Sequence, residues 1–227
     1  MTSDALTQII LYAIPVILAV TFHEAAHGFV ALYFGDETAK NQGRVTLNPI
    51  KHVDLFGTII LPLLLIVSNA GFIFGYAKPV PVNFAQLRNP RWDMLWVAAA
   101  GPAMNMLLAL VSALSLYGAG LLDGEVAALV GNVLLFSIQL NVMLAIFNML
   151  PLPPLDGSKV IAAFLPMSVM RPYLAFGRYG MTVLLLLLIV LPLLSARTGF
   201  GLDIFGVLVQ RPAEVVMALL LTLVGRG

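Results

Sequence analysis

Two histidines and a glutamate lie within five consecutive residues, His23-Glu24-Ala25-Ala26-His27. On an α-helix, residues i and i+4 point in directions only about 40° apart, so both imidazoles project from one face. This spacing suits two ligands of one Zn²⁺, with Glu24 placed to take a proton from a water at the metal. The pattern predicts a zinc site with hydrolytic chemistry.

Glu24 has two alternative roles, as a further metal ligand or as a buried ion-pair partner. No basic residue lies near it in the sequence, and a glutamate between two ligating histidines is the general base of hydrolytic zinc sites. We therefore predict that Glu24 is catalytic and that His23 and His27 bind the metal.

The cluster lies inside an apolar stretch, residues 5–33, that is long enough to cross a membrane. Ionisable residues at membrane depth are costly and usually functional. Residues 1–4 carry no basic side chain, and the apolar run is longer than the core of a signal peptide. We expect a retained transmembrane helix that carries the metal ligands.

The composition predicts a membrane protein. Of 227 residues, 60% are hydrophobic and 10% are charged, against about 45–50% and about 25% in soluble domains. The net charge of +1 gives no indication of a nucleic-acid partner, and the absence of cysteine excludes disulfides and thiolate zinc sites. We expect one membrane-embedded domain over 1–227, with a core of 1–157 and C-terminal helices in 158–227.

Apolar runs predict an all-α polytopic membrane protein with about five to six membrane-embedded helices. The segment 55–75 is short and contains Pro62, so it is predicted to be re-entrant. The last segment, 203–224, is interrupted by Gln210-Arg211-Pro212, which leaves its form open. The strong spanning candidates are 5–34, 93–119, 126–150 and 179–196.

Charge supports the re-entrant prediction. If 55–75 does not cross, nearly all basic loop residues fall on one side of the membrane, with Arg197 opposite. The positive-inside rule makes the rich side cytoplasmic and places the N-terminus outside. The residues on the rich side are Lys40, Arg44, Lys51, Lys78, Arg88, Arg91, Lys159, Arg171 and Arg178.

The loop 76–92 is predicted to contain a short extended stretch, because Val80 and Val82 alternate with prolines. Two interpretations are equally supported. An extended edge near the site could pair with an unwound substrate, or the stretch is an ordinary proline-rich connector.

A catalytic zinc usually takes three protein ligands and leaves one position for water. Asp156 is the best third candidate, since it follows a spanning run and a proline-rich break, Pro151-Leu152-Pro153-Pro154. Broken helices at membrane depth are tolerated where they line a cavity. The alternative role for Asp156 is helix capping. Asp123 and Glu125 flank Gly124 and are interpreted as a solvated turn.

Three asparagines are candidates for supporting roles. Asn105 either donates to a developing oxyanion or forms an interhelical hydrogen bond, and the two are equally supported. Asn148 either supports the site or joins helices, whereas Asn141 is expected to join helices. His52 lies in a charged loop and is expected to be exposed.

Three motifs together resemble the site-2 protease family of intramembrane zinc metalloproteases. They are His23-Glu24-Ala25-Ala26-His27, then Gly101-Pro102-Ala103-Met104-Asn105, then the sequence NMLPLPPLDG at 148–157. The chain resembles a minimal member, without room for a PDZ or CBS domain.

The resemblance implies that zinc is held by His23, His27 and Asp156, with Glu24 as the base. Asn105 matches the family's GPxxN position, and Asn148 the first asparagine of its LDG motif. The resemblance also implies hydrolysis of peptide bonds within a transmembrane protein substrate, in contact with membrane lipid, at a site nearer the cytosolic face.

We therefore predict an intramembrane zinc endopeptidase of a prokaryotic cell membrane. The main alternative is a membrane metal-binding protein or metal transporter that uses the same ligands. A transporter needs polar groups at several depths, whereas the run Met181–Leu194 holds Thr182 as its one polar residue. A second alternative, an inactive scaffold that binds helices, is disfavoured by the intact Glu24.

Overall fold

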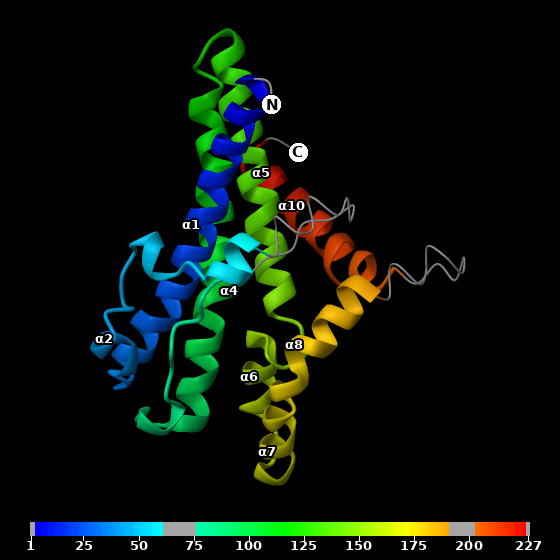
Figure 1. The fold of residues 1–227 in the computed structure, drawn as a ribbon. Helices are drawn as coiled ribbons and strands as arrows, with labels where there is room; N and C mark the ends of the chain where they lie inside the picture. Colours follow the sequence, from blue (N-terminus) through cyan, green and yellow to red (C-terminus); the bar gives the residue numbers. More distant parts are fainter. Residues whose placement is uncertain (1–2, 61–75, 191–202, 226–227) are drawn as a thin grey trace.

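The computed structural model describes residues 3–60, 76–190 and 203–225. Every regular element within these ranges is helical, and they contain no strand. The all-α prediction is confirmed. Figure 1 shows the long helices side by side, with shorter helices at one end.

Four described helices are long and apolar enough to cross a membrane. Three are α1 (Ser3–Tyr33), α4 (Pro90–Ala119) and α5 (Gly124–Asn148), close to the predicted spans. The fourth joins the π-helical turn Gly206–Gln210 to α10 (Arg211–Leu223). Pro212 lies just after the π-helical turn, in which the N–H of Arg211 donates to the carbonyl of Gly206, and the helix continues through it.

The predicted span 179–196 is described only in part. It begins in α8 (Gly177–Leu185) and continues through the π-helical turn Leu186–Val190, and 191–202 lie outside the described residues. The total of five to six membrane-embedded helices therefore stays a prediction.

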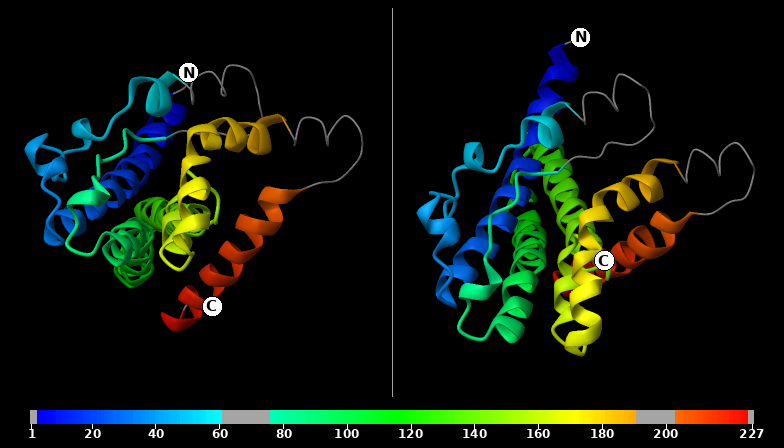
Figure 2. Two further views of the ribbon diagram at one scale, coloured as in Figure 1. Left: turned by 90° about the horizontal axis from the view of Figure 1, so that it is seen from below. Right: turned by 60° about the horizontal axis from the view of Figure 1, so that its bottom comes forward.

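The core forms where α4 packs against α5 and α1, while α10 packs mainly on α5 (Figure 2). Alanines at the contacts allow the helices to approach closely, and branched side chains fill the remaining space. The central cluster consists of Ala109, Ala113, Leu116, Ile138, Val142, Ala213 and Val224.

After α5 the prolines break the helix, and the chain restarts in α6 (Asp156–Ala162), followed by α7 (Met167–Ala175). The turn is tight, because a Cβ at Gly157 would lie 2.1 Å from the carbonyl oxygen of Met149. Arg91, at the start of α4, donates to the carbonyls of Ala163 (2.6 Å) and Leu165 (3.0 Å). These contacts hold α6 against α4.

The two connectors that follow α1 are bound to each other. The first contains α2 (Thr38–Asn41), the 3₁₀ turn Pro49–Lys51 and the π-helical turn Leu55–Ile60. The second connector is described from residue 76 to the start of α4. It has no helix from 76 to 83, before the 3₁₀ turn Phe84–Gln86. This helix-free stretch contains the predicted extended loop.

Of the predicted re-entrant segment 55–75, residues 61–75 lie outside the described residues, so re-entry stays a prediction. The described residues on either side meet. The N–H of Tyr76 donates to the carbonyl of Gly57 (3.0 Å), and the Thr58 hydroxyl donates to the carbonyl of Tyr76 (2.9 Å). A single crossing would separate these groups by about 30 Å of hydrocarbon.

The expectation that His52 is exposed is wrong. Its side chain is 2% exposed, and Nε2 lies 2.9 Å from the carbonyl oxygen of Thr46. The N–H of Lys78 donates to the carbonyl of His52 at 2.9 Å. The second connector therefore covers this histidine, a contact that the charged local sequence does not reveal.

The paired connectors generate a topological prediction. Single cysteines at Thr46 and Asn89 will give the same labelling by an impermeant thiol reagent in intact cells, because both connectors lie on one side. A cysteine at Ser3 will give the opposite result. The chain has no native cysteine to interfere. Different labelling of positions 46 and 89 would contradict the arrangement.

Candidate metal centre

Three side chains that can ligate a metal converge from two helices. His23 and His27 lie one turn apart in the second half of α1, and Asp156 is the first residue of α6. The two histidine Nε2 atoms are 3.1 Å apart. Oδ2 of Asp156 lies 3.3 Å from Nε2 of His23 and 3.2 Å from Nε2 of His27.

This triangle fits one zinc ion. Zinc bonds of about 2.0–2.1 Å in a tetrahedron require ligand atoms about 3.3–3.4 Å apart, close to the three distances above. All three residues are buried, with exposures of 8%, 8% and 6% for His23, His27 and Asp156. Among the described residues, this is the one such group close enough to hold an ion.

The second nitrogen of each imidazole is held by α4. Nδ1 of His27 lies 2.7 Å from the carbonyl oxygen of Val97, which can only accept, so this nitrogen carries the hydrogen. Nδ1 of His23 lies 2.5 Å from Oδ1 of Asn105. Both Nε2 atoms are thereby left with a lone pair for the metal, an arrangement typical of ligating histidines.

Asn105 is 0% exposed and its amide is fully used. Nδ2 donates to the carbonyl of Ala19 (3.3 Å) and to Oδ1 of Asn141 (2.8 Å). With both amide hydrogens engaged, this conformation offers none to an oxyanion and favours the interhelical alternative. The predicted catalytic role of Asn105 stays a prediction.

Asn141 joins α5 to α4, as expected, because its Oδ1 accepts the hydrogen bond from Asn105. Its own Nδ2 donates to the carbonyl of Ser137 at 2.9 Å. Asn148 is half-buried and donates to the carbonyl of Leu144 in its own helix at 3.0 Å. This contact leaves both alternatives for Asn148 open. Asp123 and Glu125 are exposed, in agreement with a solvated turn.

Glu24 lies between the two histidines on α1 and contacts the second connector. One oxygen, Oε2, accepts a hydrogen bond of 2.7 Å from the backbone N–H of Val80 in the second connector. The other oxygen, Oε1, does not take part in this hydrogen bond. This contact was not foreseen from the sequence, where the only signal was the alternation of valine and proline.

Lys159 provides a cation beside the third ligand. Its Nζ lies 3.0 Å from Oδ1 of Asp156, one turn along α6. The positive charge of this ammonium favours the ionised form of the Asp156 carboxyl. Asp156 is therefore a carboxylate, the form that binds metal.

Gly101 allows α4 to approach the imidazoles. A Cβ at this position would lie 2.4 Å from Nε2 of His27 and 2.6 Å from Nε2 of His23. Such a methyl group would occupy the space next to the ligand atoms. In the sequence this glycine stood out only as the first residue of the motif Gly101-Pro102-Ala103-Met104-Asn105.

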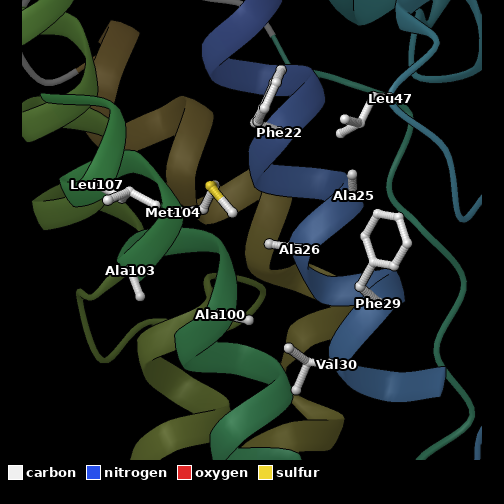
Figure 3. A pocket seen from close by; sticks show the side chains of 10 residues that line it. All are labelled: Phe22, Ala25, Ala26, Phe29, Val30, Leu47, Ala100, Ala103, Met104 and Leu107. Carbon is white, nitrogen blue, oxygen red and sulfur yellow. The ribbon is translucent and has the colours of Figure 1, made fainter. Parts of the chain in front are cut away.

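An apolar groove of about 520 Å³ runs along the other flank of α1, between α1 and α4. Figure 3 shows Ala25 and Ala26 of α1 and Ala100 and Ala103 of α4 along this groove. Glu24 does not line it. The groove and the general-base candidate therefore lie on different sides of α1.

Comparison with known proteins identifies the family. The model of peptidase family M50 matches residues 11–124 and 119–191. A protein of Bacillus subtilis (strain 168) named "Putative zinc metalloprotease YwhC" is 40% identical over 211 residues, covering 87% of this chain and 91% of the relative. The chain belongs to peptidase family M50, the site-2 protease family.

More distant relatives carry a similar name. The "Putative zinc metalloprotease Rip2" of Mycolicibacterium smegmatis is 28% identical over 173 residues, covering 76% of this chain and 64% of the relative. The Rip2 protein of Mycobacterium tuberculosis (strain ATCC 25618 / H37Rv) is 29% identical over 171 residues, covering 75% and 63%. No solved structure matches the chain.

The family, the four apolar helices and the ligand triangle lead to one description. The protein is a multi-pass membrane zinc metalloprotease, and its cofactor is Zn²⁺.

Gly101→Ala will lower the zinc content of the purified protein, because the added methyl group lies within 2.6 Å of both ligand nitrogens. Gly118→Ala is the matched control. Gly118 lies on the same helix, and a Cβ there would meet no atom within 4 Å. Elemental analysis of both variants checks this. Equal zinc in the two proteins would contradict the close approach of α4.

Proposed function

We propose that this protein is an intramembrane zinc endopeptidase that hydrolyses peptide bonds within or near transmembrane segments of other membrane proteins. The observation that carries the proposal is the position of the ligand triangle. Two of its members lie on α1, whose residues Leu11–Tyr33 are long and apolar enough to cross a membrane. A substrate segment can reach such a site from within the bilayer.

In this mechanism His23, His27 and Asp156 hold the ion, and their other polar atoms are fixed by Asn105, Val97 and Lys159. When bound there, zinc would supply Lewis-acid chemistry that lowers the pKa of a water to about 7. Glu24 accepts the proton of the attacking water and delivers it to the leaving amine. Because Oε2 accepts the Val80 N–H, the mechanism assigns the transfer to the other oxygen, Oε1.

The substrate we propose is a transmembrane helix that unwinds locally. A helical peptide bond is shielded by its own hydrogen bonds and neighbouring side chains, so cleavage requires a local opening. Residues of low helix propensity, such as glycine, proline or asparagine, favour that opening. Membrane lipid surrounds both proteins and is the second partner we propose.

We further propose that the site faces the cytoplasmic side of a prokaryotic cell membrane. The basic residues of both connectors, together with Lys159, Arg171 and Arg178, support this orientation through the positive-inside rule.

Glu24→Gln will abolish cleavage and retain zinc. Glutamine has nearly the same shape, and the three ligands stay in place, but it cannot accept the proton. We expect a loss of about a hundredfold or more. The measurement uses a tagged reporter with one apolar span interrupted by Asn-Gly, combined with elemental analysis. Zinc loss as large as in His23→Ala would mean that Glu24 is a ligand.

In cells, the same variant supplies a search for substrates. A comparison of membrane proteomes with wild-type protein and with Glu24→Gln will reveal membrane-embedded segments that accumulate uncleaved in the variant.

Asp156→Ala will lower both zinc content and cleavage, because two histidines alone leave the coordination shell incomplete. Asp123→Ala and Glu125→Ala are the controls, since both residues are exposed at the turn before α5. They will change neither property. Full zinc and full activity in Asp156→Ala would require a different third ligand.

A further inference from the structure

The second connector presents a single backbone donor to Glu24. In Pro79-Val80-Pro81 only Val80 has an N–H, because proline lacks one. That N–H donates to Oε2 of Glu24 at 2.7 Å, and the Val80 side chain is 8% exposed. The one amide hydrogen of this tripeptide is therefore used by the proposed general base.

Arg44 holds the other side of the same peptide unit. Its side chain is 6% exposed, and Nη2 donates to the carbonyls of Lys78 (2.8 Å) and Pro79 (3.4 Å). The Pro79 carbonyl and the Val80 N–H belong to one planar peptide group. The shorter bond, to Lys78, fixes the preceding peptide group, and the longer one reaches the oxygen of the peptide group whose N–H binds Glu24.

The first connector also restrains this segment through His52. Lys78 donates its N–H to the carbonyl of His52 at 2.9 Å, while the buried imidazole of His52 contacts the carbonyl of Thr46. The segment that carries the Val80 N–H is therefore held by the first connector at Lys78 as well as at Pro79. None of these contacts involves His23, His27 or Asp156.

We propose that Arg44 is a positioning residue for Glu24, acting through the Pro79–Val80 peptide group. A glutamate side chain has several rotamers, and a general base must lie within hydrogen-bond reach of the proton that it accepts. Anchoring one oxygen holds the other in a defined direction. The inference rests on the proposed function, in which Glu24 is the base.

The test compares Arg44→Gln with Arg88→Gln. Arg88 lies in the second connector and donates to the carbonyl of Tyr33 at 3.2 Å, away from Glu24, so the control removes one guanidinium charge from the paired connectors without touching the Pro79–Val80 peptide group. With the Asn-Gly reporter, Arg44→Gln will lower kcat by about tenfold, with KM changed by less than about twofold. Zinc content will not change, Arg44→Lys will recover part of the loss, and Arg88→Gln will retain wild-type kcat.

A double variant separates positioning from a general effect on folding. Glu24→Asp shortens the side chain by one methylene group, so its carboxylate no longer reaches the Val80 N–H. In that background Arg44→Gln will cost far less than in the wild type. If the loss of kcat in the double variant equals the product of the losses in the two single variants, the proposal is overturned, because Arg44 would then act independently of Glu24.

Hydrogen exchange supplies a readout that does not depend on cleavage. Val80 carries the sole amide hydrogen between Pro79 and Pro81, and both Glu24→Ala and Arg44→Gln will speed its exchange, whereas Arg88→Gln will not. Unchanged exchange in the first two variants would overturn the proposal.

The two hypotheses can fail separately. If wild-type protein leaves the reporter intact while the Val80 amide is protected as described, the proposed function fails and the contact stands. If wild-type protein cleaves and Arg44→Gln retains or raises kcat, the positioning role alone fails. A raised kcat would mean that the connector holds Glu24 back.

Discussion

The structure depends on bringing two imidazoles and a carboxylate together among apolar helices. Buried polar atoms are costly unless they have partners, so the atoms that face away from the triangle are each paired. His23 and His27 are held by α4, and Asp156 by Lys159. Because Asn105 also bonds to Asn141 and to the carbonyl of Ala19, one network fixes the positions of α1, α4 and α5.

The same requirement explains the backbone around the site. α4 contacts the imidazoles through Gly101, where any side chain would enter the space beside the ligand nitrogens. The prolines after α5 end that helix, and α6 then begins at Asp156, which faces α1. Without an ion between them, the lone pairs of the two Nε2 atoms and the Asp156 carboxylate oxygen lie close enough to repel one another. Metal binding and the packing of these helices are therefore coupled.

The connectors organise the other face of α1. Glu24, in the second half of this helix, and Asp36, just beyond its end, each accept a backbone N–H from the second connector, at Val80 (2.7 Å) and Asn83 (2.6 Å). Asp36 is fully buried, as is most of Arg44. The proposed base thus belongs to a surface formed by α1 and the connectors, whereas the ligands belong to the helix bundle.

The sequence by itself determined the features that depend on the helical repeat, on the length of apolar runs relative to a membrane, and on helix-breaking prolines. The spacing of His23 and His27 places both on one helix face, long apolar runs predict α1, α4 and α5, and the prolines before Asp156 predict the break. The tertiary structure alone decided the partners. Asn105 and Val97 lie 82 and 70 residues from the histidines they hold, and Val80 lies 56 residues from Glu24. His52 was wrongly expected to be exposed for the same reason. Burial of a loop residue is set by a segment that packs on it from elsewhere in the chain, and no local pattern encodes that contact.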